Sequence, residues 1–402
     1  MNVLFLSLGF PERSDRNIYS DLMQEFGHRG NQVYVVCQRE RRFGKQTELN
    51  LENGIHVLRV KTGNITKTNV FEKGISTVLI ESQFKKAIIR YFRGIKFDLI
   101  LYSTPPITFE KVVKFLKNRD NCKTYLLLKD IFPQNAVDIG MIKRGSFIWR
   151  YFRMKEKRLY KISDYIGCMS KANVEYVLKH NPGIDKTKVE ICPNSINPSE
   201  ISGNINKDVL REKYGIPTNA VTYIYGGNLG RPQGIDFVIE VIDYLKDRSD
   251  IFFLLVGSGT EYYRLYNYIQ KRKHHNVMLI EKLPKDEYDQ LLQSCDVGLI
   301  FLDPRFTIPN FPSRLTAYME YSLPVVAATD VNSDLKDTLE QGQCGGWTES
   351  GDLLGFTSLL EKLAKEPDLR LQMGKNGRKY LEEHYSVVTS YEIITKHISN
   401  DW

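Results

Sequence analysis

Short, predominantly apolar runs recur along this chain, and longer segments with helical spacing separate them. The first half contains NVLFLSL, NQVYVVC, FDLILY, KTYLLLK, DYIGCMS and VEICPN, and the second half contains VTYIYGG, IFFLLVGSG, NVMLIEKL, DVGLIFL and LPVVAAT. Strands that are apolar on both faces belong to parallel sheets covered by helices on both sides. Two such series predict an α/β protein with two doubly wound, Rossmann-like domains.

The boundary between the two series is expected near Pro193–Asp208, which is rich in Asn, Ser and Pro and has no clear period. We therefore expect one domain over residues 1–198 and a second over residues 205–379. Residues from about 380 to 402 have helical spacing and are expected to pack back on the first domain. Ligands of open parallel sheets bind beyond the carboxyl ends of the strands, so the cleft between the domains is the expected active site.

Charge is distributed unevenly between the two halves. Residues 1–200 carry 34 Lys and Arg against 20 Asp and Glu, a net of +14, whereas residues 201–402 carry 22 against 28, a net of −6. The first half therefore favours an anionic partner. Nucleic acid is not the expected partner, because no recognised nucleic-acid-binding module is present.

The cysteines and the apolar runs predict a cytoplasmic protein. Six cysteines are scattered without C-x-x-C pairing, which favours reduced core thiols and argues against a structural metal site. The opening MNVLFLSLGF lacks the basic start and the cleavage site of a signal peptide. No apolar run approaches the length of a membrane span.

Three strand-to-helix turns of the second half have the features of anion sites: GGNLGRPQG (Gly226–Gly234), VGSGTE with Gly257 and Gly259, and Pro312–Arg314. Such turns direct backbone N–H groups at phosphate, and the third adds a hydroxyl and a guanidinium. The first turn is neither the dinucleotide fingerprint nor a P-loop. One such turn alone is best explained as an ordinary tight turn or helix cap, but three at matching positions favour a ligand site.

GGNLGRPQGID, LLVGSGTE, LPKDEYDQLLQSCDVGLIFL and PSRLTAYMEYSLPVVA resemble, in order and spacing, the retaining glycosyltransferases of family 4. KDIFPQNAVDIG and CPNSIN in the first half extend the resemblance, which looks strongest to the branch that transfers amino-deoxyhexoses such as N-acetylfucosamine in capsule or O-antigen assembly. It implies the GT-B fold and retaining transfer, without a metal or other cofactor, from a nucleotide diphosphate sugar that we expect to be UDP-linked. The acceptor implied is a glycan on a lipid diphosphate. The implied donor-binding residues are Gly227, Asn228, Gln233, Gly257, Ser258, Gly259, Lys282, Leu283, Pro312, Ser313, Arg314, Leu315 and Glu320.

Two departures from the family pattern concern charged side chains. Where many members have an Arg and a Lys in the first glycine turn, this chain has Asn228 and Gln233. We expect Arg231, in a catalytic role, and Arg314 to neutralise the donor diphosphate instead. The family's paired Glu positions fall on Pro309 and Ala317, so neither carboxylate is present.

Glu320 lies three residues after Ala317, on the same helix face, and could reach a ribose hydroxyl. A surface or helix-capping role is an equal alternative for this carboxylate. The carboxylates of PKDEYDQ fit a solvated helix face, and no DxD-like metal pair lies near the glycine turns.

Acceptor contacts are expected from the first half. Asp130 follows a strand and precedes Phe132–Pro133, so it is expected either to orient the sugar or the acceptor hydroxyl, as a catalytic residue, or to form an Asx-turn. Gly9, Arg13 and Arg16 follow the first strand and are candidates for an acceptor phosphate, with a solvated loop as the alternative.

Two basic segments, VLIESQFKKAIIRYFRGIK and KRGSFIWRYFRMKEKRLYK, predict peripheral binding to the anionic inner face of the plasma membrane. The alternative for each is a core-packed helix with a charged outer face. The expected contacts are Lys85, Lys86, Arg90, Arg93, Arg150 and Arg153. Two other functions remain open from the sequence: a non-catalytic scaffold subunit of the same fold, or a sugar-nucleotide epimerase.

Overall fold

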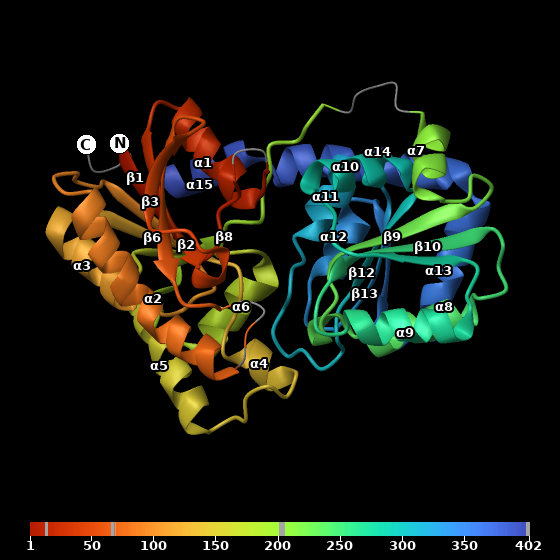
Figure 1. Cartoon of the computed structure of the whole chain (residues 1–402), viewed down its shortest axis with the longest axis horizontal. Helices are drawn as coiled ribbons and strands as arrows, with labels where there is room; N and C mark the ends of the chain where they lie inside the picture. The colour runs from red at the N-terminus through yellow and green to blue at the C-terminus, as the bar shows by residue number, and fades with distance from the viewer. Residues whose placement is uncertain (13–14, 66–67, 69, 201–205, 399–402) are drawn as a thin grey trace. The chain divides into compact units, whose positions relative to one another are not determined.

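The computed structural model describes residues 1–12, 15–65, 68, 70–200 and 206–398, and it divides into two compact units (Figure 1). Unit 1 comprises residues 1–197 and the C-terminal segment from Val387, and unit 2 comprises Pro198–Ser386. Each unit has its own sheet and its own apolar core. The chain thus enters unit 2 once and returns once to unit 1.

Unit 1 is built on an eight-stranded sheet. The third and fourth strands in chain order pair antiparallel, and all other neighbouring strands pair parallel. The spatial order is β3-β4-β2-β1-β5-β6-β7-β8. The strands are β1 (Asn2–Ser7), β2 (Gln32–Glu40), β3 (Glu48–Glu52), β4 (Ile55–Thr62), β5 (Leu99–Ser103), β6 (Lys123–Leu128), β7 (Tyr165–Cys168) and β8 (Val189–Ile191). The central strand β1 is buried throughout Val3–Leu6, as its continuous apolar sequence predicts.

The hairpin β3–β4 was not predicted from hydrophobic runs, because β3 is a short, mostly polar edge strand. The chain nonetheless carries a recognisable hairpin signal at Asn53–Gly54. Both residues have positive φ, 50° and 81°, which is the backbone geometry that selects Asn-Gly in two-residue hairpin turns.

Helices cover both faces of the unit 1 sheet (Figure 1). They are α1 (Ile18–His28), α2 (Val70–Tyr91), α3 (Glu110–Asp120), α4 (Gln134–Asp138), α5 (Phe147–Ile162), α6 (Lys171–His180) and α15 (Val387–Thr395), with 3₁₀ turns η1 (Arg41–Phe43) and η2 (Lys186–Lys188). The Asn17 side chain caps α1 by accepting from the N–H groups of Tyr19 and Ser20. The returning helix α15 packs on α1, where the rings of Tyr391 and Phe26 lie 4.8 Å apart.

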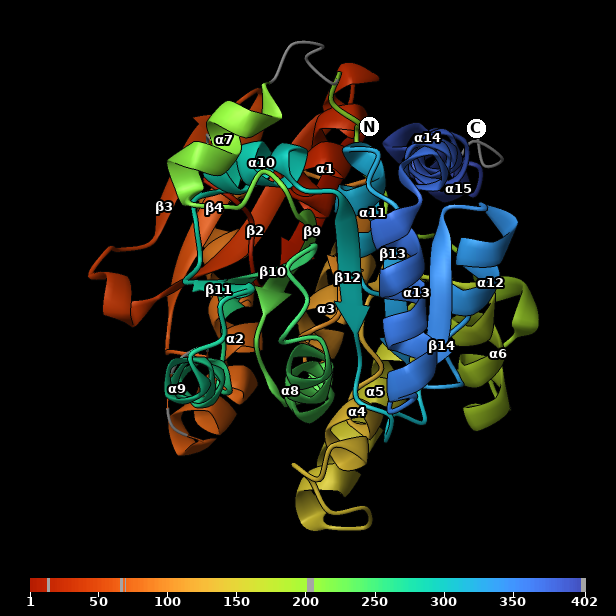
Figure 2. The ribbon, with the colours of Figure 1, turned by 90° about the vertical axis from the view of Figure 1, so that its right-hand side faces the viewer.

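Unit 2 is a six-stranded, fully parallel sheet in the order β11-β10-β9-β12-β13-β14 (Figure 2). The strands are β9 (Val221–Asn228), β10 (Ile251–Ser258), β11 (Val277–Ile280), β12 (Val297–Phe301), β13 (Val325–Thr329) and β14 (Gly345–Glu349). The chain builds outward from β9 in one direction and from β12 in the other, so the strand order reverses between them. Ligands of such sheets bind outside the carboxyl ends of the strands at this switch point.

The helices of unit 2 form two layers (Figure 1). They are α7 (Lys207–Tyr214), η3 (Arg231–Gln233), α8 (Ile235–Tyr244), α9 (Tyr262–Arg272), α10 (Lys285–Ser294), α11 (Arg314–Glu320), α12 (Leu335–Gln341), α13 (Leu353–Lys365) and α14 (Pro367–His384). The side chains of Phe237, Leu265 and Phe356 bring α8, α9 and α13 into one core with the sheet. This packing fixes β9 and β10, whose carboxyl ends carry the glycine turns.

Candidate functional site

The glycine-rich carboxyl ends of β9 and β10, with the turns that follow them, are in close contact next to the switch point of unit 2. A Cβ on Gly257 would lie 1.8 Å from the carbonyl oxygen of Gly227, and a Cβ on Gly259 would lie 2.2 Å from that of Leu229. Gly227 has φ +130°, a backbone conformation that other residues rarely adopt. The N–H of Leu229 donates to the Ser258 carbonyl at 3.0 Å. The two turns are therefore in direct backbone contact, with the Asn228 side chain beside Gly259.

Asn228 and Gln233, the uncharged residues at the positions of the family's cations, bond to each other. The Asn228 Nδ2 donates to the Gln233 Oε1 at 2.9 Å, and the same oxygen accepts from the Gly230 N–H at 3.2 Å. The Tyr225 hydroxyl donates to the Asn228 carbonyl at 2.6 Å. These bonds hold the turn in shape and leave the supply of positive charge to other residues.

Arg231 is the exposed cation of this turn. Its side chain is 63% exposed, and its Nε lies 4.0 Å from the Glu261 Oε1. An exposed pair at this distance contributes little to stability, so the guanidinium can exchange this carboxylate for an anionic ligand at small cost.

Arg314, the first residue of α11, lies against the same turn. Its guanidinium carbon is 4.3 Å from the centre of the Tyr225 ring, and its Nη2 is 3.3 Å from the position of a Cβ on Gly227. The Nη1 is buried without a hydrogen-bond partner in the described part of the chain. No described carboxylate forms an ion pair with Arg314. Because buried donors are normally bonded, this arrangement leaves a charged donor prepared for an anion.

Two tyrosines that sequence reasoning missed, the buried Tyr318 and the half-buried Tyr288, support the site. The Tyr318 hydroxyl accepts from the Gly226 N–H at 3.1 Å and lies 3.2 Å from the Ile224 carbonyl and 3.1 Å from the Leu299 carbonyl. It thus ties β9 to β12 across the switch point, and burial raises its pKa to about 12, so it stays a neutral donor. A Cβ on Gly226 would lie 1.7 Å from the Tyr288 hydroxyl oxygen. Only the tertiary fold reveals these contacts, because the tyrosines are scattered along the sequence.

The other predicted donor-binding residues of unit 2 differ in position. Ser258 ends β10 at the glycine turns, and Pro312, Ser313 and Leu315 flank Arg314, with Leu315 buried. Lys282 and Leu283 lie in the loop after the outer strand β11, exposed and half-buried respectively.

Glu320 lies away from the rest of the predicted set. It is the last residue of α11 and is 3% exposed, and its Oε1 accepts from the Ser199 N–H at 2.9 Å. Arg314 begins the same helix, so the two side chains are separated by the length of α11, about 9 Å at 1.5 Å per residue. The structure therefore places this carboxylate in a buried backbone contact, at neither the surface nor a helix start.

In unit 1, Asp130 lies beyond the carboxyl end of β6. Its Oδ1 accepts from the Asn135 Nδ2 at 2.7 Å, and its N–H donates to the Thr104 Oγ1 at 3.1 Å. Burial is the main cause that raises the pKa of Asp130 to about 6, opposed by the bond from Asn135. The carboxyl can therefore change charge near neutral pH.

The raised pKa of Asp130 predicts a pH-dependent stability. Because the folded chain holds this proton more tightly than the unfolded chain, stability should fall as pH rises from about 4 to 6, by at most about 3 kcal/mol. The Asp130→Asn variant should lack this slope and should be the more stable protein above pH 6. Urea unfolding across this range measures the difference, and parallel stability curves for the two proteins would contradict the assignment.

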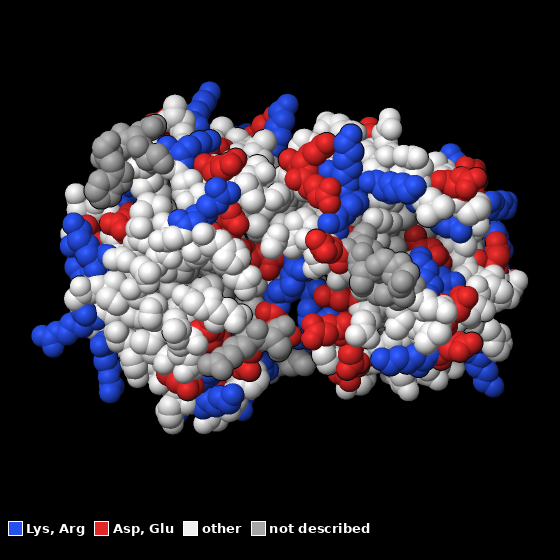
Figure 3. Space-filling model, turned by 90° about the horizontal axis from the view of Figure 1, so that it is seen from above, with Lys and Arg blue, Asp and Glu red and all other residues white. Residues whose placement is uncertain are grey.

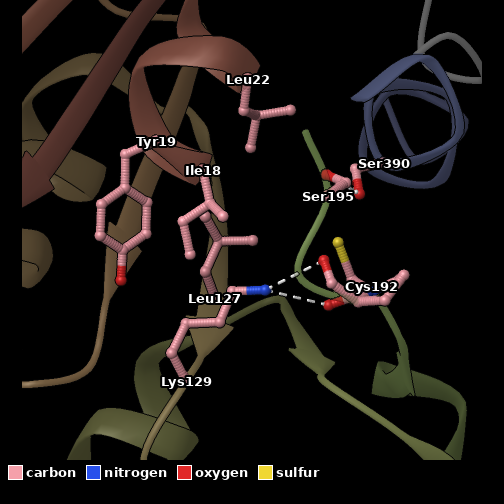
Figure 4. A pocket seen from close by; sticks show the side chains of 9 residues that line it. Ile18, Tyr19, Leu22, Leu127, Lys129, Cys192, Ser195 and Ser390 are labelled. Atoms are coloured by element: carbon pink, nitrogen blue, oxygen red, sulfur yellow. Dashed lines mark hydrogen bonds between the residues drawn. The ribbon is translucent and has the colours of Figure 1, made fainter. Parts of the chain in front are cut away.

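Lys129, which sequence reasoning did not select, borders a small cavity in unit 1 (Figure 4). Its ammonium donates to the carbonyls of Cys192 and Pro193 at 3.2 and 3.1 Å, and burial lowers its pKa. The cavity, about 10 Å³, can hold about one water and is too small for a sugar. Its lining residues are Ile18, Tyr19, Leu22, Leu127, Lys129, Cys192, Pro193, Ser195 and Ser390. Lys129 therefore fastens the segment that leads into unit 2.

The predicted acceptor residues after β1 are not all available to a ligand. Gly9 is exposed. The Arg16 guanidinium lies 2.9 Å from the Asp21 carboxylate and 2.5 Å from the Asn197 carbonyl, so this arginine holds the end of unit 1 together. Arg13 lies outside the described residues.

Of the predicted membrane contacts, Lys86, Arg90, Arg93 and Arg150 are exposed. Lys85 is half-buried, with its ammonium 4.2 Å from the centre of the Phe115 ring.

The expectation is wrong for Arg153. Its guanidinium forms an ion pair with Glu156 at 2.5 Å and donates to the His180 carbonyl and the Asn181 Oδ1 at 2.8 and 2.7 Å. A cation held by three groups from α5 and the end of α6 is not on a free basic surface.

In the described residues, no group of three or more His, Cys, Asp or Glu side chains is placed to hold a metal ion. Within the same part of the chain, every helix is too short or too polar to cross a bilayer.

Comparisons with known proteins agree with this geometry. Residues 206–380 match the family described as glycosyl transferases group 1. The chain is 23% identical over 333 residues to a probable glycosyltransferase, WbjE, of Pseudomonas aeruginosa. The aligned region covers 81% of this chain and 80% of that protein. It is 23% identical over 251 residues to the putative colanic acid biosynthesis glycosyl transferase WcaI of Escherichia coli K12. This aligned region covers 60% of each chain.

The fold is also found in a solved structure. The chain is similar to HepE of Anabaena in complex with UDP-glucose, with a TM-score of 0.70 and 15% identity over 100% of both chains. The two Rossmann-like units have the GT-B fold predicted from the sequence. The chain therefore has the GT-B fold, and its residues 206–380 form a domain of the group 1 glycosyl transferases.

Proposed function

We propose that this enzyme transfers a sugar from a UDP-sugar to a glycan carried on a lipid diphosphate, with retention of anomeric configuration and without a metal, during assembly of a bacterial surface polysaccharide. The observation that carries the proposal is the buried, unpartnered Nη1 of Arg314 beside the glycine turn of β9. The solved relative HepE in complex with UDP-glucose supports a UDP-linked donor, and the name of the colanic acid relative supports the polysaccharide pathway. An N-acetylfucosamine-type sugar is the first donor to test.

The proposed chemistry depends on charge at the leaving group. As the bond between the sugar and the diphosphate breaks, negative charge grows on the diphosphate. Arg314, Arg231 and the backbone N–H groups of the turns would stabilise it, since preorganised donors act most strongly where charge develops. The departing phosphate oxygen can take the proton of the acceptor hydroxyl, and the protein then has to hold the two substrates in register.

Unit 1 would hold the acceptor at the inner face of the plasma membrane. Its exposed Lys86, Arg90, Arg93 and Arg150 favour an anionic surface. Asp130, at the carboxyl edge of the sheet, is the candidate to orient the reacting hydroxyl.

The direct experiment presents UDP-, GDP- and dTDP-sugars, with UDP-N-acetylfucosamine among them, to the enzyme and a polyprenyl-diphosphate-linked glycan. We expect transfer from a UDP-sugar in the presence of a chelator, with product stereochemistry that matches the donor. Inversion of configuration, or transfer from GDP- or dTDP-sugars alone, would contradict the proposal.

Arg231→Ala is expected to reduce kcat/KM at least about tenfold, because loss of one charge-assisted contact to a phosphate costs about 1.5–3 kcal/mol. Lys285→Ala is the matched control, because Lys285 forms an ion pair with Asp289 on its own helix. The control should stay within about twofold of the wild type. Small and equal effects of the two substitutions would remove Arg231 from the site.

A further inference from the structure

The exposed surface of α5 and of the turn before it carries no negative charge. Between residues 141 and 161, every exposed side chain is either apolar or basic. The one carboxylate in this stretch, Glu156, is 4% exposed. The exposed residues with side chains are Met141, Lys143, Arg144, Phe147, Ile148, Arg150, Met154, Lys157, Arg158 and Lys161. None of these cations forms an ion pair with a described residue.

The neighbouring helix α2 continues this surface. Its carboxylate Glu81 is buried and lies 3.7 Å from the ammonium of Lys155, which also lies 3.5 Å from Glu110 of α3, the helix that packs against both α2 and α5. From residue 73 to residue 93, the exposed side chains again include no Asp or Glu. They are Lys73, Ile75, Val78, Leu79, Ser82, Lys86, Ile89, Arg90 and Arg93.

Residues 141–148, which we call the α4–α5 corner, carry three large exposed apolar side chains, including the most exposed one of this surface. Phe147 is 90% exposed, Met141 60% and Ile148 59%. In two perpendicular views the corner projects at the lower end of unit 1 (Figures 1 and 2). Large apolar side chains gathered at a projection usually mark an interaction site.

The distribution of charged and apolar side chains indicates which kind of partner binds the surface of α2 and α5. The face of unit 1 seen in Figure 3 shows both acidic and basic side chains, as is usual for a solvated surface. On α2 and α5, apolar and basic side chains alternate at helical spacing, as in Phe147, Arg150 and Met154. This combination suits an anionic lipid surface, where apolar groups enter the acyl boundary and cations contact headgroups.

We propose that the α4–α5 corner inserts Met141, Phe147 and Ile148 into an anionic lipid bilayer. The exposed basic residues of α2 and α5 contact the headgroups around it. The inference builds on the proposed function, which requires unit 1 to reach an acceptor embedded in lipid. It goes beyond charge attraction, because insertion makes the bound state resistant to salt.

The test is flotation of the full-length enzyme with phosphatidylglycerol–phosphatidylcholine vesicles, without nucleotide, at low and high salt. Wild type should float with the vesicles and remain bound at high salt. The double variant Phe147→Ser, Ile148→Ser keeps every charge and should lose at least about tenfold in vesicle affinity. The matched control replaces Leu51 and Leu354, which are exposed to a similar extent at 60% and 63%, with serine and should bind as wild type does.

The depth to which residue 147 enters the bilayer is measured with the Phe147→Trp variant and vesicles of brominated lipids. On binding, these lipids should quench the fluorescence of the added tryptophan. Complete release of wild type by salt, or unchanged binding by the serine double variant, would overturn insertion. Binding to native membranes but not to protein-free vesicles would overturn it in favour of a protein partner. Because no nucleotide sugar is used, insertion can succeed while the proposed transfer fails, or the reverse.

Discussion

Replacing Arg314 with methionine is expected to lower kcat/KM at least about 100-fold without destabilising the fold. A donor aimed at developing phosphate charge is worth about 3 kcal/mol when the site excludes water. The guanidinium rests on the Tyr225 ring, and its Nη1 has no partner in the described chain. Methionine keeps most of the side-chain volume and removes a buried charge that no carboxylate compensates. The thermal midpoint should therefore stay the same or rise.

This pairing of lost activity with retained stability distinguishes a ligand-binding role from a structural one. If Arg314 served mainly to pack α11 against β9, its loss should lower the unfolding temperature together with the activity. Circular dichroism melts and initial rates on the same preparations separate these outcomes. A strongly destabilised variant would contradict the account of this residue.

Gly257→Ala is the second substitution with a large expected effect. The added methyl would lie 1.8 Å from the backbone oxygen of Gly227, and this contact is with main chain that cannot rotate away. The two turns must separate, which should cost unit 2 about 3 kcal/mol and deform the phosphate-facing surface. We expect both a lower unfolding temperature and loss of UDP binding.

Gly183→Ala is the control for this substitution, because nothing lies within 4 Å of a Cβ at that position. Differential scanning calorimetry with and without UDP compares the two variants. A Gly257→Ala protein that unfolds and binds UDP as wild type does would show that the interlocked turns are not required.

Most of the architecture could be predicted from hydrophobic runs, because strands buried on both faces need continuous apolar sequence. The predicted runs correspond to β1, β2 and β5–β13. The strands that were not predicted from the sequence are β3, β4 and β14, which lie at or next to the edges of the sheets. β3 and β14 are only partly buried, as in the sequence GGWTE of β14, and the mostly buried β4 interrupts its apolar residues with His56, Arg59 and Lys61, so the apolar signal is weak in all three.

The candidate site was predictable only in part. Turn glycines are visible in the sequence because their backbone needs restrict the residue type, and Arg314 is adjacent to such a turn. The sequence could not show that Asn228 and Gln233 bond each other, or that Asn181 engages Arg153 from another helix. Contacts of this kind depend on which side chains the fold brings together, and spacing along the chain does not encode them.

The measurement that tests the central claim most directly is calorimetric titration of UDP and UMP into the wild type and into Arg314→Met. If Arg314 holds the diphosphate, wild type should prefer UDP over UMP by at least about tenfold, and the variant should lose most of that preference. UMP affinity itself should change little. Equal affinity of wild type for the two nucleotides, or a preference for UDP that persists in the variant, would contradict the claim that the turn of β9 and Arg314 bind a nucleotide diphosphate.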